Sequence, residues 1–188
     1  ELLILRSKDL LNKFLILENK RLKSIVDDYL VESKTVIAKV INDRGSPFLK
    51  SIIINKGSKQ NISLGMVALD GKYLVGKVVE VNYISSRVLL LSDLNSKIPV
   101  TIEPNGILSI LSGTGEDHGI IQYSKNDEII KNGSIVYTSG KSGLFKSGIP
   151  IGKIDDNSLN NEKNIQFFSD FTQLRFVKMF SFISKENE

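Results

Sequence analysis

From Thr35 onward the sequence is a succession of short apolar runs rich in β-branched residues, and turn residues separate them at intervals of roughly eight to twelve residues. Tight-turn signals such as Asp70-Gly71 mark hairpins between the runs. No long stretch of helical periodicity interrupts the series. Evenly spaced short strands are typical of barrels and sandwiches, so this part of the chain is predicted to be mainly β. The expected strands cover residues 36–41, 51–54, 66–69, 73–76, 77–81, 87–91, 98–102, 107–111, 119–123, 134–138, 149–154, 165–168 and 174–183.

The start of the chain follows a different pattern. Residues 2–33 contain no glycine or proline and predict one helix, which would extend about 48 Å at ~1.5 Å per residue. Two partial heptad frames, offset by a stutter, run along it. A long coiled-coil helix is the favoured interpretation, because pairing would cover the apolar stripe, and an amphipathic helix packed on its own domain is the alternative. The side chains expected to pair are Leu3, Leu10, Phe14, Leu17, Leu22, Ile25 and Tyr29.

A weak internal echo divides the β region. Residues 74–78 and 149–154 share an apolar-Gly-Lys-apolar pattern about 75 residues apart. A glycine inside a strand marks a bulge or a barrel corner, so the echo predicts two similar small barrels, with chance similarity as the alternative. The expected domains are a helix over 1–34, a first barrel over 35–103 and a second over 104–188. The border is expected near Glu103-Pro104-Asn105-Gly106, and one terminal strand is able to cross between the barrels. The glycines expected at structural turns are Gly57, Gly65, Gly76, Gly140, Gly148 and Gly152.

Composition excludes several kinds of site. The chain has no cysteine, so disulfides, thiolate zinc sites and cysteine nucleophiles are excluded. Its one histidine, His118, leaves little material for a histidine metal cluster. The formal net charge is +4, and the basic excess in residues 34–103 is not interleaved with aromatic residues, so nucleic-acid binding is not expected. No apolar run approaches the roughly 18 residues of a membrane span. The chain begins at Glu1 without a methionine, and an anchor or signal sequence is expected upstream.

Twin six-stranded barrels also occur in chymotrypsin-like proteases, so a hydrolase is a candidate function. Its general base would be His118, because the chain has no other histidine. The loop Gly113–Asp117 beside it could bind an anion, and Ser139 lies in a turn that superficially resembles that of a nucleophile. The glycines around Ser139 are better explained by a tight connection between strands. Gly140-Lys141-Ser142 resembles the end of a phosphate-binding loop, but such a loop needs another glycine at position 135, where this chain has Ile135. No catalytic residue, cofactor or metal is therefore expected.

Aromatic side chains gather near the end of the chain. Six of the nine phenylalanines lie within residues 167–182. Core packing is the favoured explanation for them, and an apolar patch that binds a partner is the alternative. The Leu144-Phe145 turn is a second candidate for partner binding, because the tip of a turn is hard to bury.

Several segments, taken together, resemble one known family. They are Leu17-Glu18-Asn19 with Leu22; Ile54 to Ser58 with Leu64 to Val67; Val75 to Val78 with Ser86 to Asp93 and Ile98 to Val100; and Val136 to Gly140 with Gly143 to Phe145 and Gly148 to Ile154. In this order, and over nearly the whole chain, they resemble the periplasmic part of the rod-shape-determining protein MreC family. The chain departs from the family's usual pattern at Asn61, Ser134, Lys141 and Lys146, which concerns local turn geometry.

The resemblance implies a protein of the bacterial inner membrane with a single N-terminal span, absent from this chain, followed by a coiled coil and two β-barrels on the periplasmic side. It implies a non-catalytic structural scaffold of the cell-elongation machinery that controls cell shape and takes no cofactor. The implied partners are further copies of the chain, in a homodimer or higher assemblies, a penicillin-binding transpeptidase and a membrane complex of MreD linked to MreB. A two-barrel hydrolase or a basic nucleic-acid-binding barrel is the alternative function.

Overall fold

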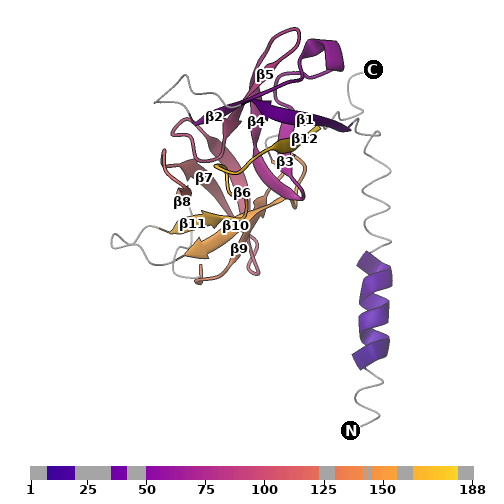
Figure 1. Cartoon of the computed structure of the whole chain (residues 1–188). Coiled ribbons are helices and arrows are strands. Elements are labelled where there is room, and N and C mark those ends of the chain that lie inside the picture. Colours follow the sequence, from indigo (N-terminus) through magenta and orange to yellow (C-terminus); the bar gives the residue numbers. More distant parts are fainter. Residues whose placement is uncertain are drawn as a thin grey trace. The chain divides into compact units, whose positions relative to one another are not determined.

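The computed structural model describes residues 8–19, 35–41, 50–122, 130–141, 143, 145–155 and 163–181. The chain divides into two compact units, one of Glu1–Ser33 with Phe182–Glu188 and one of Lys34–Ser181. Figure 1 shows that the strands of the second unit form the β part of the molecule. The described strands form two closed barrels, so the mainly β prediction is confirmed.

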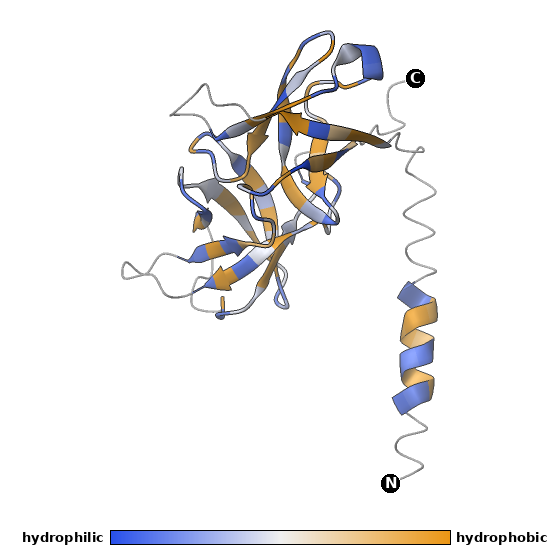
Figure 2. Cartoon of the chain, viewed as in Figure 1, coloured by the Kyte–Doolittle hydropathy of each residue, from blue (hydrophilic) through white to orange (hydrophobic). Residues whose placement is uncertain are grey.

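Residues 8–19 of the first unit form a helix. Figure 2 shows apolar and polar residues alternating along it. Three of the residues predicted to pair lie on this helix, and their side chains are exposed: Leu10 by 66%, Phe14 by 59% and Leu17 by 66%. The rest of the predicted helix, with Leu3, Leu22, Ile25 and Tyr29, lies outside the described residues. A short helix is therefore present, and the long coiled coil stays a prediction. No helix in the described part of the chain is long and apolar enough to cross a membrane.

The first barrel closes six antiparallel strands in the order β1-β12-β3-β4-β5-β2. They are β1 (Thr35–Ile41), β2 (Ser51–Ile54), β3 (Val67–Asp70), β4 (Tyr73–Val81), β5 (Ser86–Leu90) and β12 (Phe176–Phe180). A short 3-10 helix, η1 (Ser58–Gln60), follows β2. Alternate residues of the strands point inward, as Ile52 and Ile54 do in β2 and Val177 and Met179 in β12. The C-terminal strand β12 therefore crosses over and completes the first barrel.

The second barrel closes six antiparallel strands in the order β10-β11-β8-β7-β6-β9. They are β6 (Lys97–Glu103), β7 (Ile107–Gly113), β8 (His118–Gln122), β9 (Ile135–Thr138), β10 (Pro150–Asp155) and β11 (Asn164–Phe167). Its core follows the same alternation, with Ile98, Val100 and Ile102 of β6 all at most 1% exposed.

The two barrels have the same topology in a permuted chain order. The second barrel uses six consecutive strands, β6 to β11, whose order around the ring is β6-β7-β8-β11-β10-β9, and β9 closes the ring between β10 and β6. Substituting β12 for β6, and β1 to β5 for β7 to β11, reproduces every strand pair of the first barrel. The echo seen in the sequence is thus a true equivalence, because it matches β4 with β10.

The glycines of that echo occupy equivalent places. A Cβ atom on Gly76 would lie 2.0 Å from the carbonyl oxygen of Leu89, and one on Gly152 would lie 2.3 Å from that of Gln166. The strand register shifts beside each glycine, which marks a bulge in both barrels. Only a residue without a side chain allows the neighbouring strand to approach so closely.

The passage between the barrels differs from the expected border. Strand β6 pairs with β7 and β9 in the second barrel, so the turn at residues 103–106 is a hairpin within that barrel. The chain instead passes between barrels at residues 91–96. The carboxylate of Asp93, which is fully buried, fixes this passage by accepting hydrogen bonds from the main-chain N–H groups of Lys50 (2.8 Å) and Asn95 (2.7 Å). The proline and glycine of residues 103–106 therefore belong to a hairpin of the second barrel. The passage between the barrels is held instead by the buried carboxylate of Asp93.

Candidate functional site

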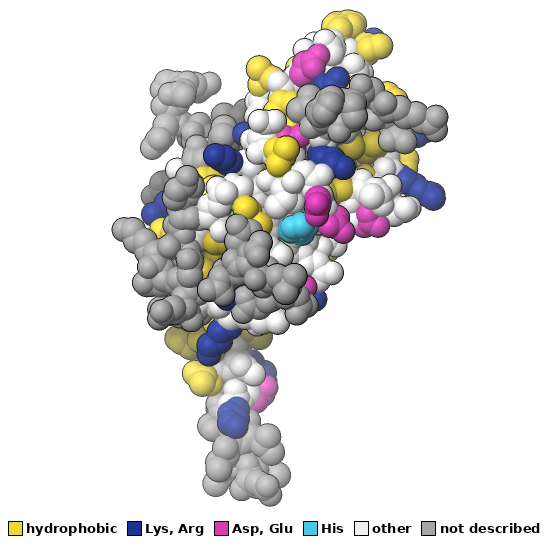
Figure 3. All heavy atoms as spheres, turned by 90° about the vertical axis from the view of Figure 1, so that its left-hand side faces the viewer, with side chains coloured by type: hydrophobic (Ala, Val, Ile, Leu, Met, Phe, Trp, Pro, Cys, Tyr) yellow, Lys and Arg dark blue, Asp and Glu magenta, His cyan; other side chains and the backbone are white. Residues whose placement is uncertain are grey.

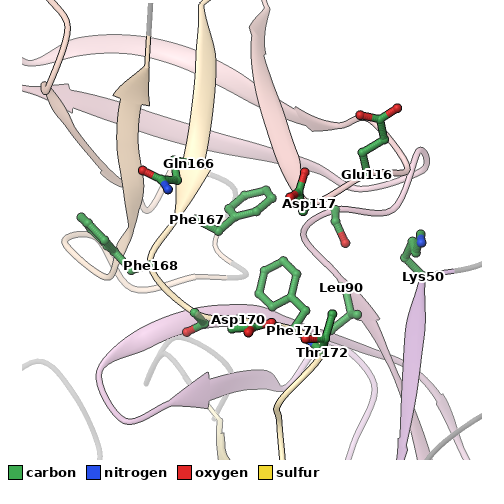
Figure 4. A pocket seen from close by; sticks show the side chains of 12 residues that line it. Lys50, Leu90, Glu116, Asp117, Gln166, Phe167, Phe168, Asp170, Phe171 and Thr172 are labelled. Carbon is green, nitrogen blue, oxygen red and sulfur yellow. Dashed lines mark hydrogen bonds between the residues drawn. The ribbon is translucent and has the colours of Figure 1, made fainter. Parts of the chain in front are cut away.

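A groove of about 630 Å³ lies between the two barrels. The first barrel contributes Lys50 and Leu90, and the second contributes Glu116 and Asp117 from the β7–β8 turn. Ser92 comes from the passage between the barrels, and the rest of the lining comes from residues 166–172, at the end of β11 and on the way to β12. The groove therefore exists only because the C-terminal strand returns to the first barrel. Figure 4 shows side chains of both barrels around it.

Aromatic rings form one wall of the groove. The rings of Phe167 and Phe171 face each other with centroids 5.0 Å apart. Phe168 points away from them, as Figure 4 shows, and packs against Tyr73 of β4 at a centroid distance of 5.0 Å. This second contact joins the two barrels, and it fixes the chain segment that carries the other two rings.

The charged groups of the lining are three acids and one lysine. The Oδ1 atom of Asp170 accepts hydrogen bonds from the Thr172 hydroxyl (2.6 Å) and the Thr172 main-chain N–H (2.9 Å). These bonds hold the pKa of Asp170 below its ordinary value, the hydroxyl bond having the larger effect. Asp170 is therefore ionised at neutral pH. The exposed carboxylates of Glu116 and Asp117 also line the groove.

His118, the candidate general base, faces carboxylates. Its Nδ1 atom lies 3.6 Å from Glu116 and 3.5 Å from Asp117. These three side chains are the group in the described part of the chain that could hold a cation, but the two carboxylates are 73% and 99% exposed. Figure 3 shows acidic side chains gathered beside the histidine. Among the described residues no hydrogen bond joins His118 to a serine, and the Ser139 hydroxyl instead faces the main-chain N–H of Lys141 at 3.5 Å. A catalytic triad is not assembled there.

The structure corrects the expectation for Phe145, whose side chain is only 4% exposed. The buried side chain of Thr138 explains this, because it hydrogen-bonds the Lys146 carbonyl and accepts the main-chain N–H of Ile149. These bonds fold the turn back onto the barrel and carry Phe145 inward. Leu144 lies outside the described residues.

The phenylalanines of β12 do not fill the core. Val177 and Met179 point inward, so Phe176 points outward and is 58% exposed. It lies opposite Lys39 in the β1–β12 register, and Ile37, exposed by 68%, lies opposite Lys178. The core explanation is therefore wrong for Phe176, and an apolar surface interrupted by lysines lies on the outside of the first barrel.

The glycines predicted at turns fall into two groups. Gly65, Gly140 and Gly148 have positive φ angles of 81°, 72° and 87°, which L-residues rarely adopt. Gly57 instead makes a close approach, because a Cβ there would lie 2.2 Å from the Asn82 carbonyl oxygen. These glycines set the backbone of the barrels and do not line the groove.

Sequence reasoning missed the groove, and only part of its lining carried a signal. The cluster of phenylalanines pointed to residues 167–171, and His118 drew attention to the turn before it. Nothing in the sequence joined these segments to Lys50, since a groove between barrels depends on their packing.

Comparison with known proteins identifies the fold. Residues 40–181 match the family model of the rod shape-determining protein MreC, barrel core. The cell shape-determining protein MreC of Cereibacter sphaeroides is 31% identical over 140 residues, which are 74% of this chain and 46% of that protein. The corresponding protein of Caulobacter vibrioides is 32% identical over 145 residues, covering 77% of this chain and 42% of that protein. The chain thus spans less than half the length of these relatives.

Solved structures agree. The crystal structure of MreC from Pseudomonas aeruginosa superposes with a TM-score of 0.70 at 29% identity, covering 78% of this chain and 98% of that one. The major periplasmic domain of the cell shape-determining filament MreC has a TM-score of 0.68 at 23% identity, with coverage of 80% and 97%. The MreC chain in a complex with penicillin-binding protein PBP2 from Helicobacter pylori has a TM-score of 0.59 at 14% identity, with coverage of 78% and 98%. The last two likenesses are of fold alone. The paired barrels and the family match over most of the chain show that this protein belongs to the MreC family of cell shape-determining proteins.

Proposed function

We propose that this chain is a non-catalytic scaffold on the periplasmic side of the bacterial inner membrane, where it helps to control cell shape by self-association and by holding proteins of peptidoglycan synthesis. Membership of the MreC family supports this role, and so does the periplasmic origin of a protein with the same fold. Anchoring to the membrane, through a span outside this chain, is part of the proposal.

The observation that carries the proposal is the exposed apolar surface of the helix. Leu10, Phe14 and Leu17 are each more than half exposed in a single chain. Exposed leucine and phenylalanine spaced by three and four residues on a helix are typical of a surface that pairs with another helix. We infer that two copies associate there, with Leu3, Leu22, Ile25 and Tyr29 extending the interface, and that the barrels are held as a pair for other partners.

The proposed partner proteins are a penicillin-binding transpeptidase and the MreD–MreB membrane complex. The transpeptidase is supported by the Helicobacter pylori complex, in which a protein of this fold is bound to PBP2. Neither the hydrolase nor the nucleic-acid alternative gains support, since His118 faces carboxylates and the groove is lined by three acids but only one lysine.

Sedimentation of the chain tests self-association. The wild-type chain is expected to sediment as a dimer or larger species, whereas a Leu10→Asp/Leu17→Asp variant is expected to be monomeric because charges would be buried in the helix interface. The matched control is Asn12→Asp/Asn19→Asp, which adds the same two negative charges at exposed polar positions of the same helix. A monomeric wild-type chain at high micromolar concentration contradicts the proposal, and so does equal dissociation of the two variants.

A further inference from the structure

The groove between the barrels has the composition of a binding site. The Phe167 and Phe171 rings and the Leu90 side chain supply an apolar surface, as Figure 4 shows. Binding sites commonly pair an apolar lining with a few polar groups that converge on the ligand. The groove lies between two closed barrels joined by the Tyr73–Phe168 contact, so its walls are set by the fold.

Charge gives the groove a sign opposite to that of the whole chain. Glu116, Asp117 and Asp170 face it with a single lysine, Lys50, although the chain carries a formal net charge of +4. Among the described residues no lysine or arginine forms an ion pair with these three acids, whose near neighbours are His118 and Thr172. Uncompensated acids around an apolar cleft favour a cationic ligand.

A buried hydroxyl adds a further polar group. Ser169 lines the groove and is 7% exposed, and its Oγ atom has no hydrogen-bond partner among the described residues. A buried polar group without a partner costs free energy. The Oγ atom has less than 1 Å² of exposed surface, so the main chain of a bound peptide could satisfy it only after a local shift of the groove wall.

We propose that this groove binds a short extended segment of a partner protein in which lysine or arginine alternates with leucine or an aromatic residue. The apolar side chains of the segment pack on Phe167, Phe171 and Leu90, and its cations pair with Glu116, Asp117 and Asp170. The inference rests on the proposed scaffold role only for the source of the segment, which is another protein of the assembly.

Fluorescence anisotropy with three labelled octapeptides tests the inference. The first alternates lysine with leucine and phenylalanine, the second carries glutamate in place of lysine, and the third carries serine in place of the apolar residues. Only the first is expected to bind, and its affinity is expected to fall as salt is raised, because exposed charge pairs are screened. Amide chemical-shift changes of the labelled chain are expected at residues 116–118 and 166–172.

Variants of the full chain locate the site. Asp117→Asn/Asp170→Asn is expected to weaken binding of the first peptide about three- to tenfold, since two exposed charge pairs are lost. Glu103→Gln/Asp155→Asn removes the same charge away from the groove and is expected to leave the affinity unchanged. Equal weakening by both double variants, binding of the glutamate peptide, or shift changes outside the groove would overturn the inference. Self-association enters none of these measurements, so their failure is distinct from failure of the scaffold proposal.

Discussion

Gly76 and Gly152 show how single residues decide the shape of each barrel. Both lie in strands next to a bulge, and neither has the positive φ angle that favours glycine at other positions. Their role is therefore steric. The neighbouring carbonyl group occupies the space where a Cβ atom would stand, and it belongs to the main chain of the adjacent strand.

We expect Gly76→Ala and Gly152→Ala each to lower the free energy of unfolding by about 2–3 kcal/mol, because strands already in contact would have to move apart. Urea denaturation measures the loss. Gly71→Ala is the control, since its positive φ of 58° strains the backbone but no atom lies within 4 Å of the new Cβ. It should cost only about 1 kcal/mol, and equal losses at all three positions would show that steric contact is not the cause.

The Asp170 carboxylate gives stability a pH dependence. Hydrogen bonds from Thr172 lower its pKa in the folded chain, so its contribution is present above the ordinary aspartate pKa of about 3.9 and is lost as pH falls through the lower folded value. Thermal unfolding of wild type and Asp170→Asn between pH 6 and pH 2 tests this. The variant should melt lower at pH 6, and the gap should narrow below about pH 4. A gap that does not change with pH would contradict the assignment.

At the scale of strands, the sequence predicted strand positions best where residues alternate between the barrel core and the solvent. The short runs found from β-branched residues correspond to the strands of both barrels, and β5 and β6 show the clear alternation of buried and more exposed side chains. The two runs expected over 73–81 are one strand, β4, which continues through Gly76 with a bulge. A strand glycine weakens the local signal without ending the strand.

Turns and exposed faces were harder to predict. Phe145 was expected at an exposed tip, but a side chain seven residues earlier in the chain, Thr138, folds the turn inward. Phe176 and Phe180 have the same parity, so strand alternation places them on one face of β12, and the buried Val177 and Met179 between them show that this face is the outer one. The groove and the β12 crossover depend on packing between segments that are distant in the sequence. Local residue patterns do not predict such contacts.

At the scale of the whole molecule, the permuted order of strands ties the end of the chain to its beginning. Strand β12 pairs with β1 and β3, and its Val177 and Met179 side chains lie in the core of the first barrel. The second barrel is complete without it. Because the groove is lined by the segment that leads into β12, loss of this strand would open the first barrel and the groove together.

This arrangement predicts where a core defect near the C-terminus is felt. Met179→Ala removes a fully buried side chain and is expected to destabilise the chain by about 2–5 kcal/mol. Native-state hydrogen exchange should show faster exchange in β1 to β5, up to about 140 residues earlier in the sequence. Strands β6 to β11 should keep their protection. Ile165→Ala, at a fully buried position of β11, is the matched control and should have the reverse pattern. Uniform loss of protection in both variants would contradict this prediction. It would show that the β12 crossover couples the two barrels so strongly that they unfold as one unit.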